Sequence, residues 1–398
     1  MSRLFQPLKF LSALPPPLRV SAFMFFAASL ADGVLVPFFA IWAVREAGVP
    51  VAAVGLLLGC YAGGELLATP FVGGLSDRLG RRPVLLVSTL GVGSGFAVLY
   101  FVHGAIAVAV TLAAIGIFES VLHPTAAAIV ADVVAPAELR HHYGINRMAS
   151  SIGHVVGPAL GAILAAWSLG SVFLAGAAAL LTAALAVALG LRETRAAVAE
   201  EDDDEDLTAL GAVFRDRRLA AILLPVALIE IVTSWIEAVM PLAATQVGAL
   251  TPTGVGWLFA YSGLLGAIFQ MPVLRLCRDM LGSRMVAIAC TVLALSFGTL
   301  AVAPSLAGFV IAATGLAFAG IILDPLVQAL VMELAPPQAR ATYTAALSVV
   351  SDLKDAAGPA IGTALFAVAF SLPWFSGMAV TVAAASALAV NLRRHERY

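Results

Sequence analysis

Long apolar runs, separated by short polar connections, dominate this 398-residue sequence and limit what it can fold into. Hydrophobic residues make up 61% of the chain, and charged residues only 12%. A run of about 20 apolar residues is long enough to cross the hydrocarbon core of a bilayer as a helix. Soluble domains do not have this balance, so we predict an all-α polytopic membrane protein. The chain has room for about twelve membrane-spanning helices.

The predicted helices follow the apolar runs. They cover residues 20–44, 51–73, 83–102, 105–131, 142–167, 170–191, 219–247, 253–275, 284–303, 306–334, 341–370 and 372–392. Arginines gather in the connections after every second helix, and only Arg45 lies in a connection of the opposite set. Because short basic loops stay on the cytoplasmic side, we predict a multi-pass protein of the cytoplasmic (inner) membrane with both termini in the cytoplasm.

A polar stretch, residues 73–83, separates the second predicted helix from the third. Its sequence is Gly-Gly-Leu-Ser-Asp-Arg-Leu-Gly-Arg-Arg-Pro. Charged side chains are costly inside hydrocarbon, so we predict a short loop at the membrane surface. Glycine permits a sharp turn, and proline suits the first turn of the helix that follows. The residues that define the pattern are Gly73, Asp77, Arg78, Gly80, Arg81 and Arg82.

This pattern closely resembles the signature between the second and third helices of the major facilitator superfamily. The resemblance implies two six-helix bundles related by pseudo-symmetry, with a binding site where the bundles meet. It also implies that the arginines of the signature pair with the acid that ends the fourth helix, here Asp132. We expect Asp77 to face the start of the eleventh helix, around residues 342–344, where the helix dipole favours an anion. The alternative is an ordinary basic stop between two helices.

The two halves of the sequence repeat each other. Residues 123–132 match residues 324–333, and Gly157-Pro158 returns as Gly358-Pro359 at the same separation. The charged turn between the second and third helices is echoed by Asp279, Gly282 and Arg284. The repeat predicts an N-terminal bundle at residues 1–191 and a C-terminal bundle at residues 219–398.

The segment between the predicted bundles, residues 192–218, is the long polar linker of the chain. It contains an uninterrupted acidic block, residues 200–206. A block of like charges repels itself, so we predict a disordered cytoplasmic spacer. Apolar residues at helical spacing after the block predict a short amphipathic helix on the inner surface. A docking site or a weak Ca²⁺ site is the alternative role for the acidic block.

A second motif lies in the fifth predicted helix, where glycines recur around a proline: Gly153, Gly157, Pro158 and Gly161. It resembles the glycine–proline motif of the antiporter branch of the superfamily, especially the twelve-span drug:proton antiporters. Glycines four residues apart let two helices pack closely, and tight packing alone is the alternative explanation. One position departs from this family, because Leu112 stands where the fourth helix usually carries an arginine. The usual basic partner in proton coupling is therefore absent.

Ionisable residues lie deep within the predicted helices, many of them roughly 17–21 Å from the cytoplasmic end at about 1.5 Å per residue. They are costly there and must face an aqueous cavity or one another. We predict that they line a proton and substrate cavity, with Asp32 as the first choice for the proton site. Structural ion pairs are the alternative for some of them. The set comprises Asp32, Glu65, Glu119, His123, Arg147, His154, Glu230, Glu237, Asp324, Asp352, Lys354 and Asp355.

Lys354 is the one lysine of the chain outside the N-terminal tail. Acids one and two residues away do not share its helix face. We therefore predict a partner on another helix, and Asp32, Glu65 and Glu230 have the matching depth. A local pair with Asp352 or Asp355 is the alternative.

Together these features predict a secondary active transporter that exports an amphiphilic or cationic small molecule against an inward flow of protons. An excess of acids favours cations, and the aromatic residues of the first helix, among them Phe38, Phe39 and Trp42, are expected to offer surface to such a substrate or to lipid. The alternative is a proton-coupled symporter or a uniporter for a sugar, organic acid or other metabolite. A more remote alternative is a membrane sensor that does not transport.

The sequence contains no motif of a hydrolase, a zinc protease or a phosphate-binding loop, so we predict no enzyme activity. We expect no cofactor and no metal site. The expected partners are protons, a small-molecule substrate and the lipid bilayer, with no nucleic acid. We expect the protein to act as a monomer.

Overall fold

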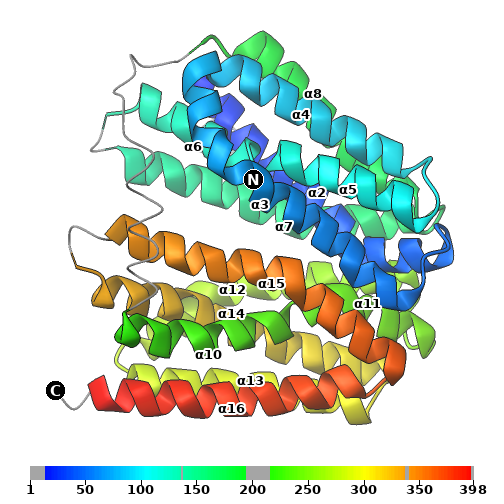
Figure 1. The fold of residues 1–398 in the computed structure, drawn as a ribbon, viewed down its shortest axis with the longest axis vertical. Coiled ribbons are helices and arrows are strands. Elements are labelled where there is room, and N and C mark those ends of the chain that lie inside the picture. The colour runs from blue at the N-terminus through cyan, green and yellow to red at the C-terminus, as the bar shows by residue number, and fades with distance from the viewer. Residues whose placement is uncertain (1–13, 136–137, 194–215, 337–339, 396–398) are drawn as a thin grey trace, which may run out of the picture. The chain divides into compact units, whose positions relative to one another are not determined.

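A computed structural model describes residues 14–135, 138–193, 216–336 and 340–395 of the chain. These residues form helices joined by short connections, with no strand among them (Figure 1). Eleven helical segments in this part of the chain are long and apolar enough to cross a membrane, by length and composition. The helix α15 (Arg340–Val368) is also long enough to cross a membrane. It is not among the eleven because Asp352, Lys354 and Asp355 make its middle more polar. The predicted all-α polytopic fold is confirmed.

The chain divides into two compact units, and each is described by itself. Unit 1 comprises Met1–Gly48 and Cys60–Ala199, and unit 2 comprises Val49–Gly59 and Glu200–Tyr398. The helices of unit 1 are α2 (Pro16–Arg45), most of α3 (Val51–Leu79), α4 (Arg81–Leu99), α5 (Ala105–Glu119), α6 (Leu122–Val133), α7 (Leu139–Ala165) and α8 (Ser171–Gly190). Those of unit 2 are α10 (Arg217–Thr233), α11 (Trp235–Gln246), α12 (Pro252–Cys277), α13 (Gly282–Val302), α14 (Leu306–Leu334), α15 and α16 (Leu372–His395). The start of α3, up to Gly59, therefore belongs to unit 2, although the sequence predicted that it belongs to the N-terminal bundle.

The same pattern of helix packing occurs in both units. In unit 1, α2 packs against α7 and α8, and α4 packs against α5 and α8. In unit 2, α10 packs against α15 and α16, and α13 packs against α14 and α16. These pairs correspond when the two halves of the sequence are aligned. The repeat in the sequence is therefore also a repeat in packing, as expected of two pseudo-symmetric bundles.

Aromatic residues fill the interior of each unit. Trp42 of α2 meets Phe173 of α8 edge to face, with ring centroids 4.7 Å apart. In unit 2, Phe297 of α13 lies against Trp374 of α16 at 6.4 Å. The expectation that Trp42 and its neighbours Phe38 and Phe39 offer surface to substrate or lipid is wrong, since all three are at most 2% exposed. They are buried because α6, α7 and α8 all pack against α2.

Two of the predicted helices are interrupted. Residues 105–131 form α5 and α6, because Pro124 lacks the N–H that the Ser120 carbonyl oxygen would otherwise accept. Residues 219–247 form α10 and α11, which meet at Ser234. The Ser234 hydroxyl donates a hydrogen bond of 2.8 Å to the backbone of the preceding turn, a contact that often bends helices.

The charged stretch at residues 73–83 is mostly helical, so the predicted loop is wrong. Helix α3 continues to Leu79 and α4 begins at Arg81, which leaves Gly80 alone as the turn. The φ angle of Gly80 is 97°, in the left-handed region that glycine adopts without strain. A helix can extend beyond the hydrocarbon core, where its charged residues reach water. The polarity of the stretch therefore did not require a loop.

Candidate functional site

The glycine–proline motif of α7 sets the distance between α7 and α2 in unit 1. A Cβ added to Gly157 would lie 2.7 Å from the Leu30 carbonyl oxygen and 2.8 Å from Gly33 Cα. Gly153 and Gly161 face α2 just as closely. No larger residue fits at these positions unless the helices separate, so the motif makes the close approach of α2 and α7 possible. This approach places Asp32, next to Gly33, against the face of α7.

A second close approach lies between α3 and α5. Gly116 of α5 touches the carbonyl oxygen of Tyr61 in α3, and Gly64 of α3 touches the backbone of Ala113. Backbone contact at this distance brings the next turn of α5, with Glu119, beside the side chains of α3. The two close approaches together converge on one region of unit 1.

Ionisable side chains from five helices meet in that region, and we call them the carboxyl cluster: Asp32, Tyr61, Glu119, His123 and His154. The side chains of Asp32, Tyr61 and Glu119 lie close enough to act on one another electrostatically. His123 and His154 lie close enough for their charges to act on Asp32. Glu65 lies close enough for its charge to act on Glu119.

Glu119 is the most enclosed member of the carboxyl cluster. It is 5% exposed, and its Oε2 atom has no hydrogen-bond partner among the described residues. Two ionised carboxylates near each other repel, and a proton on one of them would relieve that repulsion. The arrangement can therefore hold a proton away from bulk water.

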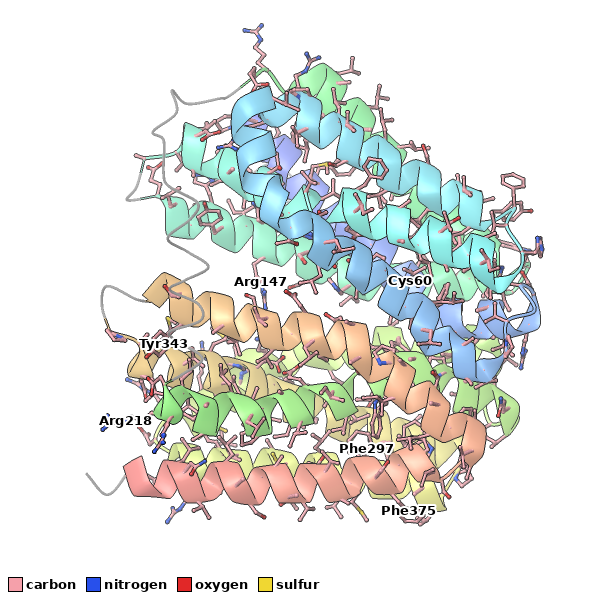
Figure 2. All side chains as sticks on the ribbon, viewed as in Figure 1. Cys60, Arg147, Arg218, Phe297, Tyr343 and Phe375 are labelled. Atoms are coloured by element: carbon pink, nitrogen blue, oxygen red, sulfur yellow. The ribbon has the colours of Figure 1, made fainter. Side chains whose placement is uncertain are left out.

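The histidines of the cluster are fixed by neighbours of their own. The His123 ring packs edge-on against Phe25, with centroids 5.0 Å apart. The His154 Nδ1 atom lies 3.1 Å from the Ser150 carbonyl oxygen, and the side chain is exposed. Arg147, from the first half of α7, is also exposed (Figure 2) and takes no part in these contacts.

The acids of unit 2 gather around Lys354 instead. Its Nζ atom lies 3.7 Å from Glu230 Oε2 and 3.3 Å from Asp355 Oδ1. Glu230, on α10, is one of the partners predicted for Lys354 from its matching depth in the membrane. The contact with Asp355, the next residue, is the local pair given above as the alternative, and the long lysine side chain reaches it along its own helix. Asp352 lies on the exposed side of α15.

A cavity of about 290 Å³ opens beside this ion pair, entirely within unit 2. The charged residues in its wall are Glu230, Glu237, Asp324 and Lys354. Apolar side chains of α10, α12, α13 and α14 form most of the remaining wall. Four of the predicted cavity residues of the C-terminal half thus line one cavity.

The arginine signature makes the contact that the resemblance implied. Arg81 Nε lies 3.1 Å from Asp132 Oδ2, and both side chains are largely buried. Glu193 was not predicted: its carboxylate accepts hydrogen bonds from the backbone N–H groups of Arg81 and Arg82, at 2.8 and 3.2 Å. These are otherwise unpaired donors at the start of α4, so Glu193 caps that helix.

Other parts of the prediction have no described contact that supports them. The side chains of Asp77 and Arg78 lie outside the described residues, as does the predicted amphipathic helix of the linker. Asp279 and Arg284, the echo in unit 2, are exposed at the turn between α12 and α13. The gating role of the signature stays a prediction.

Sequence reasoning also missed Tyr61. It lies four residues before Glu65, on the same face of α3, so the helical period could have linked the two. Nothing in the sequence marks Glu193, because its role depends on how the end of α8 meets the start of α4.

The sequence profile of the Major Facilitator Superfamily matches residues 21–359. The tetracycline resistance protein, class C, of Escherichia coli is 37% identical over 129 residues, which is 31% of each chain. The multidrug resistance protein MdtH of Enterobacter sp. (strain 638) is 24% identical over 340 residues, covering 84% of this chain and 82% of that relative. For the tetracycline resistance protein, the chain thus spans less than a third of the relative's length.

Solved structures share the fold. The nucleoside transporter NupG has a TM-score of 0.80 at 12% identity, covering 97% of this chain and all of that one. The human organic anion transporter MFSD10 has a TM-score of 0.64 at 22% identity, covering 94% of this chain. The family profile covers most of the chain, and the chain therefore belongs to the Major Facilitator Superfamily of membrane transporters.

Proposed function

We propose that this protein is a proton-coupled exporter in the cytoplasmic membrane, with both termini in the cytoplasm. It moves an amphiphilic or cationic small molecule outward by alternating access while protons move inward. The observation that carries the proposal is the carboxyl cluster, which brings the acids Asp32 and Glu119 close to each other within unit 1. The names of the relatives, which refer to resistance to tetracycline and to multiple drugs, support the outward direction.

The pair of Asp32 and Glu119 serves as the proton site in this mechanism. In the protonated pair, one carboxyl group donates a hydrogen bond to the other, so a single negative charge is shared. When the proton leaves, two negative charges stand in contact and repel each other. Loading and unloading therefore change the electrostatic energy of the interface between α2 and α5, which is the kind of change that can bias a two-state transporter.

His123 and His154 are the basic side chains next to this pair. Leu112, where the family usually carries an arginine, is fully buried on α5 and offers no charge. The bases that act on Asp32 in the described part of unit 1 are these two histidines. We propose that they stabilise the deprotonated pair in place of the missing arginine.

Variants of the pair test the proposal in liposomes that contain the purified protein. Asp32→Asn and Glu119→Gln should each abolish transport driven by a pH gradient while exchange of substrate across the membrane continues, because exchange needs no net proton transfer. Glu46→Gln removes an exposed acid outside the cluster and should leave both activities unchanged. Gradient-driven transport at the wild-type rate in both variants of the pair would refute the proton site.

A further inference from the structure

The cavity in unit 2 has features of a ligand site. Its volume, about 290 Å³, lies at the lower end of the range for small-molecule pockets. Seven helices contribute to its wall: α10, α11, α12, α13, α14, α15 and α16. One part of the wall is apolar and includes Ile229, Phe259 and Leu316, and another part carries charge. This division suits a ligand that has an apolar body and a polar end.

The charges in the wall are unbalanced. Glu230, Glu237 and Asp324 are acids, and Lys354 is the one basic residue of the lining. The wall therefore has an excess of negative charge when these groups are ionised. An anionic ligand would meet several acids, whereas a cation would reduce the repulsion between them.

Lys354 is held unequally by its two partners. Its ammonium group is 3.3 Å from Asp355 and 3.7 Å from Glu230. Asp355 is about half exposed and lies outside the lining, while Glu230 forms part of the wall. The ammonium group can thus release Glu230 and keep Asp355. That movement would leave a carboxylate in the wall ready for another cation.

We propose that this cavity binds an amphiphilic organic cation with a protonated amine, and that Lys354 competes with the ligand for Glu230. The inference rests on the proposed export function and names the substrate class of that function. The ligand's ammonium group pairs with Glu230, and its apolar body packs against Phe259 and the neighbouring aliphatic side chains. Without ligand, Lys354 occupies the place of the ligand's ammonium group, so Glu230, whose side chain is 29% exposed, keeps an ionic partner.

Binding to the purified full-length protein in detergent tests the inference, with no pH gradient present. The probes are 4-phenylbutylamine, which is protonated at neutral pH, and 4-phenyl-1-butanol, its uncharged analogue. Isothermal titration calorimetry should show binding of the amine and at least about tenfold weaker binding of the alcohol. Glu230→Gln should weaken binding of the amine by about tenfold or more, because the ligand loses its ionic partner.

The lysine variant distinguishes a competitor from a ligand-binding residue. Lys354→Met should strengthen binding of the amine severalfold, because the internal competitor is gone. Thermal unfolding checks that Lys354→Met is folded. If it is not, Lys354→Gln, which keeps a hydrogen-bond donor, is used in its place. Glu46→Gln, in unit 1, serves as the charge-matched control and should bind as the wild type does.

Three results would overturn the inference: equal affinity for amine and alcohol, unchanged affinity in Glu230→Gln, or weaker binding in both lysine variants. The experiment separates this inference from the proposed export function, since it measures binding without a proton gradient. Absence of binding in a protein that still couples export to protons would overturn the cation site alone. Amine binding as expected, in a protein that moves no protons, would overturn the coupling and leave the site standing.

Discussion

The carboxylate of Asp216, outside the membrane-spanning segments, is held by a side chain of another helix and by the backbone of the helix that follows it. Its carboxylate accepts a hydrogen bond of 2.7 Å from the Tyr343 hydroxyl and one of 2.8 Å from the Arg218 backbone N–H. Figure 2 shows Tyr343 and Arg218 at the same end of unit 2. The bond from Tyr343, followed by the backbone donors at the start of α10, lowers the pKa of Asp216 from its ordinary value.

The lowered pKa makes a prediction about pH. A carboxylate whose pKa is lower in the folded state contributes stability above its ordinary pKa, about 4, and loses that contribution as the pH falls through the folded value. Tyr343→Phe removes the main donor, so we expect a lower melting temperature than wild type near pH 7. The difference should shrink below a pH of about 4, where Asp216 becomes protonated.

The control for this prediction is Tyr261→Phe. The Tyr261 hydroxyl bonds to the Thr314 hydroxyl at 3.0 Å, so this bond joins two hydroxyl groups and involves no carboxylate. The effect of Tyr261→Phe on the melting temperature should not change as Asp216 becomes protonated. A Tyr343→Phe difference that stays constant between about pH 7 and pH 3 would contradict the assignment.

At the scale of helices, continuous apolarity predicts that a membrane helix exists better than it predicts where the helix breaks. The predicted helix at residues 306–334 coincides with α14. The breaks at Ser120 and Ser234 lie inside apolar runs, and only Pro124 gave a local signal for one of them. Contacts such as Tyr61 with Glu119 depend on which helices meet, and a single sequence does not contain that information.

The approach of α2 and α7 makes the second prediction. Gly157→Ala places a Cβ against the backbone of Leu30 and Gly33, which cannot move as a side chain could. We expect a loss of about 1–3 kcal/mol in the free energy of unfolding, as for other overpacked interiors. Thermal unfolding in detergent measures the change.

Gly144→Ala, in the same helix, is the matched control because its Cβ would meet nothing within 4 Å. Alanine favours a helix over glycine, so this variant should be neutral or slightly stabilised. Equal melting temperatures for the two variants would show that the motif does not set the helix distance.

At the scale of the whole molecule, the two units repeat one packing pattern but use corresponding positions differently. The sequence repeat pairs His123 with Asp324, and His154 with Asp355. The histidines belong to the carboxyl cluster of unit 1, whereas Asp324 lines the cavity of unit 2 and Asp355 holds Lys354. The repeat therefore predicted where ionisable side chains lie in each half, and it could not predict which partners they have.

The arginine pattern makes a prediction about membrane orientation. Glu46→Cys and Asp279→Cys place single thiols at exposed positions in predicted outer and inner connections, after the three native cysteines are replaced by alanine. A membrane-impermeant maleimide added to intact cells should label Cys at position 46 and not at position 279. Permeabilised cells should label both, which confirms that the second thiol is reactive. The reverse labelling in intact cells would place both termini outside.

Proton movement driven by substrate tests the central claim most directly. Liposomes with the wild-type protein and a pH indicator inside receive an imposed gradient of 4-phenylbutylamine, or of any substrate that the binding screen identifies. The account predicts that substrate movement in one direction drives protons in the other, and that Asp32→Asn and Glu119→Gln lose this proton movement while substrate exchange continues. Substrate transport by the wild type with no accompanying proton movement, or with protons moving in the same direction, would contradict it.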